Sequence, residues 1–372
     1  MPSELKRAFE YGIAIDASAI DGFGGDVRSD LLLHPDASTL ICLPWRPEQG
    51  KVVRMFCDIT YPNGKPFERD TSYLLKQAVA EATKKGYSFA FGAEMEFYLY
   101  KLDEEGEATK IPYDRAGYMD IAPEDKGENI RREICLMMEM MGIMPESSHH
   151  ESGPGQNEID FRYSDPLTAA DNAITFHTLV RTIAAKNGLC ADFSPKPLAN
   201  WDGNGMHINI SAKSDGQEDP MPHLIAGILD KIEDISLFLN PSEDSYRRLG
   251  QDKAPCYITW SEENRSQLVR IPTAVGEYRR AELRSADPTT NPYIAYALLI
   301  YTSLYGIEHK LPLPPASDFN IYTASATSLE SLKKLPSSIF EASAIAKESN
   351  FIKEHLPEAI ITAYLKKLNI LL

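Results

Sequence analysis

The chain has 372 residues, 43% of them hydrophobic, so it can bury a sizeable core and form about two domains. Its formal net charge of −16 argues against a nucleic-acid or anionic-membrane surface, because such surfaces need clustered lysine and arginine. Five scattered cysteines, a charged N-terminus and only short apolar runs predict reduced thiols, no secretion signal, no membrane span and a cytoplasmic location.

The first 70 residues are predicted to be rich in strands and turns. TLICLPW and KVVRMFCDI are short apolar runs, and YPNGKP reads as a turn after them. We place a domain boundary near residue 70. Residues 1–70 then form a small N-terminal domain, and residues 71–372 form the main domain.

Helices are predicted at intervals after this boundary. The first runs from Thr71 or Ser72 to Lys85, and Gly86 ends it. Others are expected at 123–141, 166–187, 222–239 and 292–307, several with proline in the first turn, where its missing N–H costs nothing. Strands lie between them, but strands and helices do not alternate regularly as in βαβ units, so the predicted fold class is α+β. The tail after 311–315 has a helical pattern, and its apolar end packs either on its own core or on another subunit.

Four predicted strands carry charged or polar side chains on one face. In FGAEMEFYLY, Glu94 and Glu96 point the same way, because alternate residues of a strand share a face. The corresponding residues of GQNEIDFRY, GMHINIS and RRAELRS are Glu158, Asp160, Arg162, His207, Asn209, Ser211, Arg280, Glu282 and Arg284. Each segment alone is compatible with a strand whose polar face is solvated. Four together favour a shared binding site.

The acidic residues of these strands indicate metal ions. The loop HHESGPGQNE adds Glu151, so five glutamates and one histidine can converge. Clustered carboxylates raise one another's pKa, so cations must compensate them. Oxygen ligands with a single imidazole suit Mg²⁺ or Mn²⁺ better than zinc. Five glutamates exceed what one such ion takes from protein, so we predict two or more ions, about 4 Å apart.

Arginine dominates the cations between residues 247 and 284. The stretch holds one lysine, Lys253, against Arg247, Arg248, Arg265, Arg270, Arg279, Arg280 and Arg284. Arginine is suited to planar, bidentate partners such as carboxylates and phosphates. No GxxxxGK[ST] loop is present, so a bound nucleotide would be held by metals and arginines. The alternative is that these arginines form surface salt bridges with the many acids.

Five segments, in this order and spacing, resemble the glutamine synthetase family, whose members join glutamate to ammonia using ATP. They are GAEMEF, HHESGPGQNEIDFR, SPKPLANWDGNGMH, ITWSEENRSQLVRIP and RRAELRSADPTTNPY, and the resemblance covers residues 11–311. It implies a catalytic domain in which antiparallel strands form a bifunnel with helices around it, preceded by a smaller β-grasp domain. It also implies a ring-shaped homo-oligomer with active sites between subunits.

The resemblance further implies a role for each matching residue. Three ligands of a first metal are implied at Glu96, Glu151 and Glu158, and three of a second at Glu94, His207 and Glu282. The groups around ATP are implied to be Arg265, Arg270, Arg280, Tyr163, Asn209 and Ser211. The contacts to the amino-acid substrate are implied to be Gly203, Arg248 and Arg284. Asp16 resembles the acid that binds and deprotonates ammonium from across a subunit boundary.

The sequence departs from the family pattern on the amine side. RLGQDKAP is one residue shorter than the pattern, and Lys253 stands where the family has a flap glutamate that takes a proton from the amine. Asp252 is adjacent and would substitute only if the shortened loop lets it reach. Asp202 replaces an asparagine, and Glu277 stands where a lysine is often seen. The chain is also short at both ends of the pattern, which implies a shortened β-grasp domain.

The leading prediction is an ATP-dependent carboxylate–amine ligase that makes a γ-glutamyl amide from glutamate and ammonia through an acyl phosphate. The catalytic residues would be Asp16, Arg265, Arg284 and Lys253. One alternative is a ligase for another small amine or a polyamine. Another, favoured by Lys253, is a nucleotide- and metal-binding regulator without turnover. A carboxylate-bridged metallohydrolase is a further alternative, although it leaves the arginines without a role.

Overall fold

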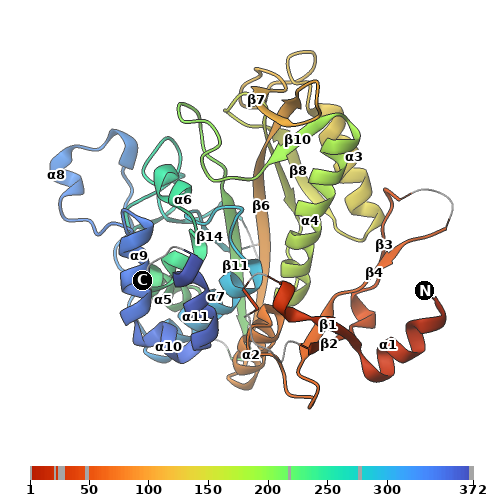
Figure 1. Ribbon diagram of the computed structural model, residues 1–372. Helices are drawn as coiled ribbons and strands as arrows, with labels where there is room; N and C mark the ends of the chain where they lie inside the picture. Colours follow the sequence, from red (N-terminus) through yellow and green to blue (C-terminus); the bar gives the residue numbers. More distant parts are fainter. Residues whose placement is uncertain are drawn as a thin grey trace.

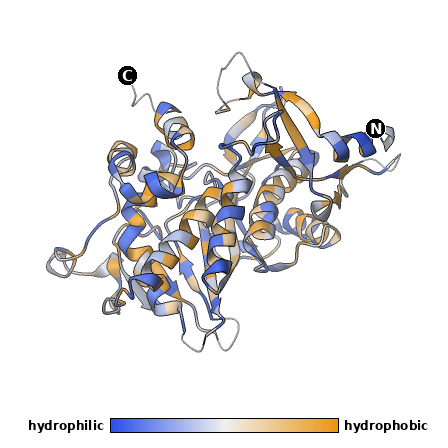
Figure 2. Ribbon diagram, turned by 90° about the horizontal axis from the view of Figure 1, so that it is seen from below, coloured by the Kyte–Doolittle hydropathy of each residue, from blue (hydrophilic) through white to orange (hydrophobic). Residues whose placement is uncertain are grey.

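A long strand, β6 (Tyr87–Leu102), runs through the middle of the molecule in the computed structural model, which describes residues 2–20, 22–23, 30–46, 50–216, 219–274 and 279–367. The C-terminal helices gather on one side of this strand, and the N-terminal strands lie on the other side near its lower end (Figure 1). Hydrophobic residues recur along the packed helices and strands, whereas the loops at the margin are largely hydrophilic (Figure 2).

The N-terminal part forms a small sheet with its own core. After helix α1 (Leu5–Tyr11), strand β1 (Ile13–Asp16) pairs antiparallel with β2 (Asp30–Pro35), which pairs with β5 (Cys57–Thr60). Strands β3 (Ile41–Cys42) and β4 (Val53–Arg54) form a separate pair. Ala17, Leu31 and Phe67 make up the buried core of this part. The prediction of strands here is confirmed, but α1 is an element that the sequence pattern did not predict.

Asp70 ties this small sheet to the rest of the chain. One oxygen of its carboxylate accepts hydrogen bonds from the N–H groups of Ser72 and Tyr73, at 3.0 and 3.3 Å, and so caps helix α2 (Thr71–Lys84). The other oxygen accepts one from the N–H of Ile59 in β5, at 3.0 Å. Arg54 also donates to Thr175 of the main part at 2.9 Å, so several side chains join the two parts, and a boundary at residue 70 remains a prediction.

The main sheet has nine strands in the described part of the chain. Its order is β12-β13-β14-β11-β6-β9-β8, with β7 and β10 also paired to β6, and only β12 and β13 run parallel. The bounds are β7 (Ala108–Pro112), β8 (Pro145–His150), β9 (Gln156–Phe161), β10 (Leu189–Asp192), β11 (Met206–Ser214), β12 (Trp260–Glu262), β13 (Val269–Ile271) and β14 (Ala281–Leu283). The four strands predicted to carry charge are confirmed as strands. They are also consecutive neighbours, in the order β14, β11, β6 and β9.

Alternation along β6 separates the core from the polar face. Ala93, Met95 and Phe97 are buried in the main hydrophobic core, so Glu94 and Glu96 lie on the opposite face. The cross-strand register then places His207 opposite Glu94. In the same way, the polar residues of β9 and β14 line the same face as those of β6.

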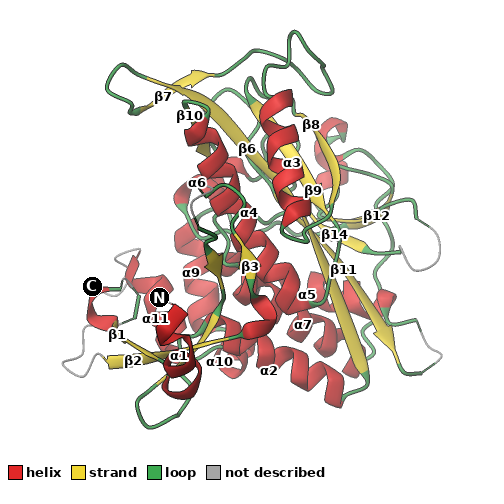
Figure 3. Ribbon diagram, turned by 90° about the vertical axis from the view of Figure 1, so that its right-hand side faces the viewer, coloured by secondary structure: helices red, strands yellow, loops and turns green. Residues whose placement is uncertain are grey.

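Helices pack against the sheet and against each other (Figure 3). Four predictions are confirmed to within two residues, by α2, α4 (Pro166–Lys186), α5 (Met221–Leu239) and α7 (Pro292–Glu308). The tail is helical as predicted, with α8 (Ala326–Leu329), α9 (Ile339–Glu348), α10 (Asn350–His355) and α11 (Glu358–Lys367), and α6 (Glu243–Arg248) is a further short helix. Ile361 and Leu365 of α11 belong to the main core, so this helix packs on its own chain. Residues 368–372 lie outside the described part.

The helix predicted at 123–141 begins later than expected. The structure has α3 (Glu128–Met140), preceded by a turn. In that turn the N–H of Lys126 donates to the carboxylate of Asp114 at 3.0 Å, and the guanidinium of Arg131 donates to Asp125. These side-chain contacts compete with helical hydrogen bonds, so the first turn of the predicted helix does not form.

Two predictions from composition concern the whole chain. All five cysteines are free thiols, as predicted from their scattered spacing. Among the helices of the described residues, none combines the length and the apolar character that crossing a membrane requires.

Candidate active site

Two adjoining cavities open on the polar face of the four neighbouring strands. The larger, of about 630 Å³, is lined by the predicted residues Glu94, Glu96, Glu151, Glu158, Gly203, His207, Arg248, Lys253, Arg265, Arg270, Arg280 and Arg284. The smaller, of about 380 Å³, contains Tyr163, Asn209 and Ser211. Glu94 and Arg280 line both cavities. Glu282 lines neither cavity, but its buried carboxylate contacts Arg284, which lines the larger one. The structure therefore gathers nearly all of the residues that the sequence singled out.

Arg162 and Arg247 are exposed and line neither cavity, and Asp16 is a further exception. It lies at the end of β1 in the small sheet and lines neither cavity, and its carboxylate accepts hydrogen bonds from the N–H and the hydroxyl of Ser18, at 2.9 and 2.6 Å. Within one chain, Asp16 is therefore not part of the site. Its predicted role across a subunit boundary stays a prediction.

Glu94, His207 and Glu282 form one compact group of candidate metal ligands, with one ligand atom of each within 4.8 Å of the others. Nδ1 of His207 lies 3.2 Å from the Glu94 carboxylate and 3.5 Å from that of Glu282. Burial by itself would raise the pKa of Glu94, but hydrogen bonds from His207 and Asn209, with the charge of Arg270, lower it to about 2. Neighbouring groups of the protein itself therefore stabilise the negative charge of Glu94.

Glu158 belongs to three other groups, one with Glu96 and His207, one with Glu151 and His149, and one with Glu94 and Asp160. Nε2 of His149 lies 3.4 Å from the Glu151 carboxylate and 3.7 Å from that of Glu158. The Glu96 carboxylate accepts hydrogen bonds from the N–H of Gly205 at 2.8 Å and from the side-chain amide of Gln156 at 3.2 Å. These contacts fix Glu96 in position and leave the cluster around Glu158 rich in oxygen ligands.

The carboxylates around Glu158 are not fully compensated by positive charges of the described residues. Burial raises the pKa of Glu158 well above its usual value, and the charges of Asp160 and Glu96 raise it further. Burial and the charge of Glu94 do the same to Asp160. Its Oδ1 atom is buried and has no hydrogen-bond partner in the described part of the chain. Hard oxygen donors with one or two imidazoles and uncompensated charge fit a divalent ion such as Mg²⁺ or Mn²⁺.

The arginines form the other wall of the larger cavity. The Nε atoms of Arg270 and Arg284 both donate to the carboxylate of Glu282, Arg284 at 3.1 Å. Arg248 is buried and donates to the carbonyl of Ser285 at 2.8 Å. Nη1 of Arg284 is buried without a hydrogen-bond partner among the described residues. A buried guanidinium N–H with no acceptor in a cavity wall is suited to an anionic ligand.

Gly203 is required where the chain crosses Arg248. A Cβ atom at this position would lie 2.3 Å from the carbonyl oxygen of Pro195 and 2.9 Å from Cγ of Arg248. Any other residue would push the loop away from the arginine. Gly203 thus allows the backbone to line the cavity directly.

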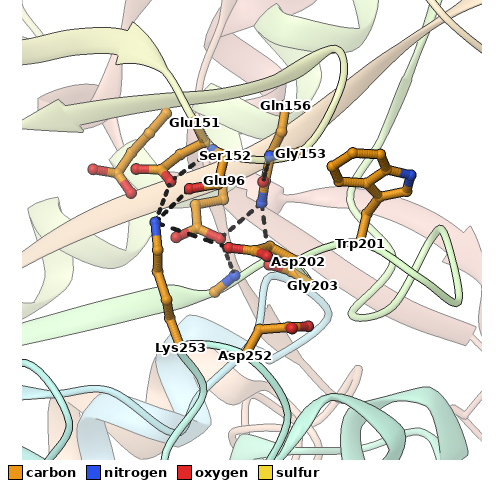
Figure 4. Close-up of polar contacts among 12 residues, drawn as sticks. Glu96, Glu151, Ser152, Gly153, Gln156, Trp201, Asp202, Gly203, Asp252 and Lys253 are labelled. Atoms are coloured by element: carbon orange, nitrogen blue, oxygen red, sulfur yellow. Dashed lines mark hydrogen bonds and ion pairs between the residues drawn. The ribbon is translucent and has the colours of Figure 1, made fainter. Parts of the chain in front are cut away.

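Lys253, not Asp252, faces the larger cavity. Its Nζ atom lies 2.6 Å from the Ser152 hydroxyl and 3.3 Å from the Glu151 carboxylate (Figure 4). The carboxylate of Asp252 instead accepts a hydrogen bond from Lys196 at 2.9 Å and does not line the cavity. The shortened loop therefore does not bring Asp252 to the position of the missing flap glutamate. Glu277 lies outside the described residues.

Sequence reasoning missed His149, Gln156 and Tyr118 as members of the site. The sequence pattern predicts one loop for HHESGPGQNE, but its first two residues belong to β8 and its last three to β9, and His149 of β8 lies opposite Glu158 of β9. The polar run PESSHH has no apolar alternation, so its strand is not visible in the sequence pattern. The sequence signal that could have identified His149 was the pair of histidines directly before Glu151.

We expect the metal-free protein to lose stability as the pH rises from about 5 to 8. The pKa values of Glu96, Glu158 and Asp160 are raised by burial, so the folded state retains protons that the unfolded chain has released. Unfolding then becomes easier with rising pH, and saturating Mg²⁺ or Mn²⁺ should cancel the trend by neutralising these carboxylates. Urea denaturation across this range, with a chelator or with metal, measures it. A free energy of unfolding that increases with pH in the presence of the chelator would contradict this account.

Comparisons with known proteins identify the family of the chain. A family model for the glutamine synthetase catalytic domain matches residues 68–369, and one for the glutamine synthetase β-grasp domain matches residues 1–62. Glutamine synthetase of Clostridium saccharobutylicum is 41% identical over 376 residues, which cover 97% of this chain and 85% of that protein. That of Methanosarcina mazei is 42% identical, with coverages of 98% and 85%.

Solved structures show the same fold. A GmaS complex with ADP superposes with a TM-score of 0.88 at 26% identity, over 99% of this chain and 88% of that one. A cryo-EM structure of Plasmodium falciparum glutamine synthetase gives 0.83 at 22% identity, over 98% and 87%. The predicted α+β fold, with a β-grasp domain before a catalytic domain, is confirmed. With both family models matching and relatives above 40% identity over nearly its whole length, the chain belongs to the glutamine synthetase family.

Proposed function

We propose that this protein is an ATP-dependent ligase that joins glutamate to ammonia through an acyl phosphate. The observation that carries the proposal is the meeting of the two cavities at Glu94 and Arg280, because a nucleotide in the smaller one would point its phosphates at the carboxylates and arginines of the larger one. Relatives named glutamine synthetase support the same activity.

Two divalent ions, Mg²⁺ or Mn²⁺, fit the carboxylates. Glu94, His207 and Glu282 would hold one ion, and Glu96, Glu151 and Glu158 the other, because Glu158 groups with Glu96 and His207 and also with Glu151 and His149. When bound, such ions neutralise the charge that develops on a transferring phosphoryl group. Asn209 connects the groups, because its side chain donates to Glu94 at 2.9 Å and accepts from Arg280 at 2.8 Å.

ATP is assigned to the smaller cavity. Tyr163, Asn209 and Ser211 line that cavity and would contact the nucleoside. Arg265, Arg270 and Arg280 line the larger one next to it and would contact the phosphates. The solved complex of GmaS with ADP supports an adenine nucleotide as the ligand of this fold.

Glutamate is assigned to the arginine wall. Nη1 of Arg284, which has no partner among the described residues, would bind its carboxylate groups together with Arg248 and the backbone at Gly203, and would orient the γ-carboxylate toward the γ-phosphate. The γ-carboxylate oxygen attacks phosphorus and ADP leaves. Ammonia then attacks the acyl carbon, and phosphate leaves. Arg265 and Arg284 would stabilise the charge of both steps.

A second copy of the chain would complete the amine side. Asp16 lies in the small sheet, outside both cavities of its own chain, so it can bind ammonium only at a neighbour's site. We therefore propose a homo-oligomer with active sites between subunits. The cation of Lys253 beside Glu151 specifically favours a second candidate, a ligase for another primary amine.

The test is ADP release with glutamate and Mg²⁺ or Mn²⁺, comparing ammonium with a panel of primary amines. ADP release with ammonium supports the proposal. Release with only one organic amine would identify the second candidate instead. Tight ATP binding without ADP release under any condition would overturn both and favour a regulator without turnover.

A further inference from the structure

A short loop between β8 and β9, residues 151–155, positions several candidate metal ligands. Glu151 is its first residue, and Glu158 lies in β9 directly after it. The N–H of Glu151 donates to the carbonyl of Gln156 at 2.8 Å, which closes the loop. Figure 4 shows the side chain of Gln156 reaching Glu96, to which it donates at 3.2 Å. We call residues 151–155 the ligand loop.

A buried pair, His150 and Asp114, lies directly behind the ligand loop. The side chain of His150 is 0% exposed and that of Asp114 is 2% exposed. Nε2 of His150 lies 2.9 Å from Oδ1 of Asp114, and Nδ1 lies 2.6 Å from the carbonyl oxygen of Glu151. Both oxygens are acceptors, so the ring donates from both nitrogens. His150 therefore joins Asp114 to the backbone of Glu151.

Asp114 also holds the other end of the ligand loop. Its Oδ1 accepts a hydrogen bond from the N–H of Gly155 at 3.0 Å, and its Oδ2 accepts one from the N–H of Lys126 at 3.0 Å. Burial alone would raise the pKa of Asp114, but the hydrogen bond and charge of His150, with these two N–H groups, lower it. One ionised carboxylate thus ties both ends of the loop to the turn before α3.

Asp114, Asp125 and His150 lie close enough together to hold a metal ion themselves, but their ligand atoms already have partners. Both oxygens of Asp125 accept hydrogen bonds from Arg131, and those of Asp114 accept backbone N–H groups. Arg131 also donates to the side chain of Asn157 in β9, at 2.6 Å. The cluster is therefore built as a support behind the ligand loop rather than as a third metal site.

We propose that Asp114 is a positioning residue, which acts through His150 and Gly155 to hold the ligand loop in the geometry that binds a divalent ion. Partners behind the ligands of a metal orient those ligands, and their loss weakens metal binding. The consequence for the metal rests on the proposed function, which assigns an ion to Glu151 and Glu158. The support of the loop does not rest on that function.

Hydrogen–deuterium exchange of the metal-free full chain tests the support of the loop. Asp114→Asn removes the charge and nearly keeps the size of the side chain. The N–H groups of Glu151 and Gly155 should exchange about tenfold faster in this variant, the scale of losing one hydrogen bond to a charged group. Mass spectrometry of peptides covering 150–156 measures the rates. Unchanged exchange of these peptides would overturn the proposal.

Mn²⁺ binding, followed by electron paramagnetic resonance, tests the consequence for the metal. We expect one ion per chain to bind about 10- to 100-fold more weakly in Asp114→Asn. The second ion should keep its affinity, because Glu94, His207 and Glu282 do not belong to the ligand loop.

His150→Gln is the second variant, and it serves alone if Asp114→Asn does not fold. It should also weaken one Mn²⁺ ion. The double variant should bind that ion no more weakly than the weaker single variant, because both changes break the same contact. Losses that add in the double variant would mean that the two residues act independently, which would overturn the proposal.

Asp70 offers a matched control. Its buried carboxylate also accepts hydrogen bonds from three backbone N–H groups, those of Ile59, Ser72 and Tyr73, but it lines neither cavity. Asp70→Asn should lower the free energy of unfolding and leave the affinity for Mn²⁺ unchanged. An equal loss of Mn²⁺ affinity in Asp70→Asn would mean that metal binding only follows global stability, and would overturn the proposal.

The two measurements separate this proposal from the proposed function. Faster exchange of the ligand loop with an unchanged affinity for Mn²⁺ would overturn the role of Asp114 in metal binding. Faster exchange in Asp114→Asn, in a protein whose wild type binds no Mn²⁺, would leave Asp114 as the support of the loop and the proposed function wrong.

Discussion

Replacing Glu96 with alanine is expected to abolish the stabilisation by ATP that depends on Mg²⁺ or Mn²⁺. Glu96 shares a group of candidate metal ligands with Glu158 and His207, and the hydrogen bonds from Gly205 and Gln156 hold it in place. A ligand at 100 times its Kd stabilises the folded state by about 2.7 kcal/mol, so losing the metal should remove most of that amount. Thermal unfolding with ATP, with and without metal, measures the difference.

The control for this prediction is Glu107→Ala. Glu107 is exposed, on the turn between β6 and β7, away from both cavities. It should keep the full metal-dependent shift. The variant at Glu96 is judged by the shift alone, because losing the acceptor for Gly205 will lower its metal-free stability as well. A full shift in Glu96→Ala would remove Glu96 from the metal site.

Replacing Glu282 with alanine is expected to be the most destabilising change in the site, by about 3–5 kcal/mol in the absence of metal. Its carboxylate is buried between the guanidinium groups of Arg270 and Arg284 and lies 3.5 Å from His207. Alanine would remove the buried carboxylate that both guanidinium groups contact. Urea denaturation in the presence of a chelator measures the free energy of unfolding.

Arg279 provides the comparison for Glu282. Its ion pair with Asp219 is about half exposed on both sides, so Arg279→Ala should change the free energy of unfolding by less than about 1 kcal/mol. Glu282→Gln should fall between the two, because the amide oxygen still accepts a hydrogen bond. A loss below about 1 kcal/mol in Glu282→Ala would contradict the assignment of Glu282 as the shared counter-charge of two arginines.

Most of what the sequence could predict about the site follows from the two-residue period of side chains along a strand. Glu94 and Glu96 on one face of β6, and His207 on one face of β11, follow from alternation, which is a local property. Which strands are neighbours is not local; the charged faces of four strands together favoured a shared site, and the family resemblance divided the ligands between two metals. The structure then showed that Glu158 joins three groups of ligands, a detail that depends on side-chain positions across strands.

The parts that could not be predicted depend on loops and on polar strands. His149 belongs to a strand without apolar alternation, and Tyr118 lies in the long connection before α3. The contact of Lys253 with Ser152 joins two loops about a hundred residues apart in the chain, and no local pattern encodes it. The departure at Lys253 was visible in the sequence, but its consequence required the positions of both loops.

The central claim is that a carboxylate oxygen of glutamate attacks the γ-phosphate of ATP. It is tested most directly with glutamate labelled with oxygen-18 in its γ-carboxylate, supplied with ATP, ammonium and Mg²⁺. The account predicts that each glutamine formed is accompanied by one phosphate that carries one labelled oxygen. Phosphate without label, released as ATP is consumed, would contradict it.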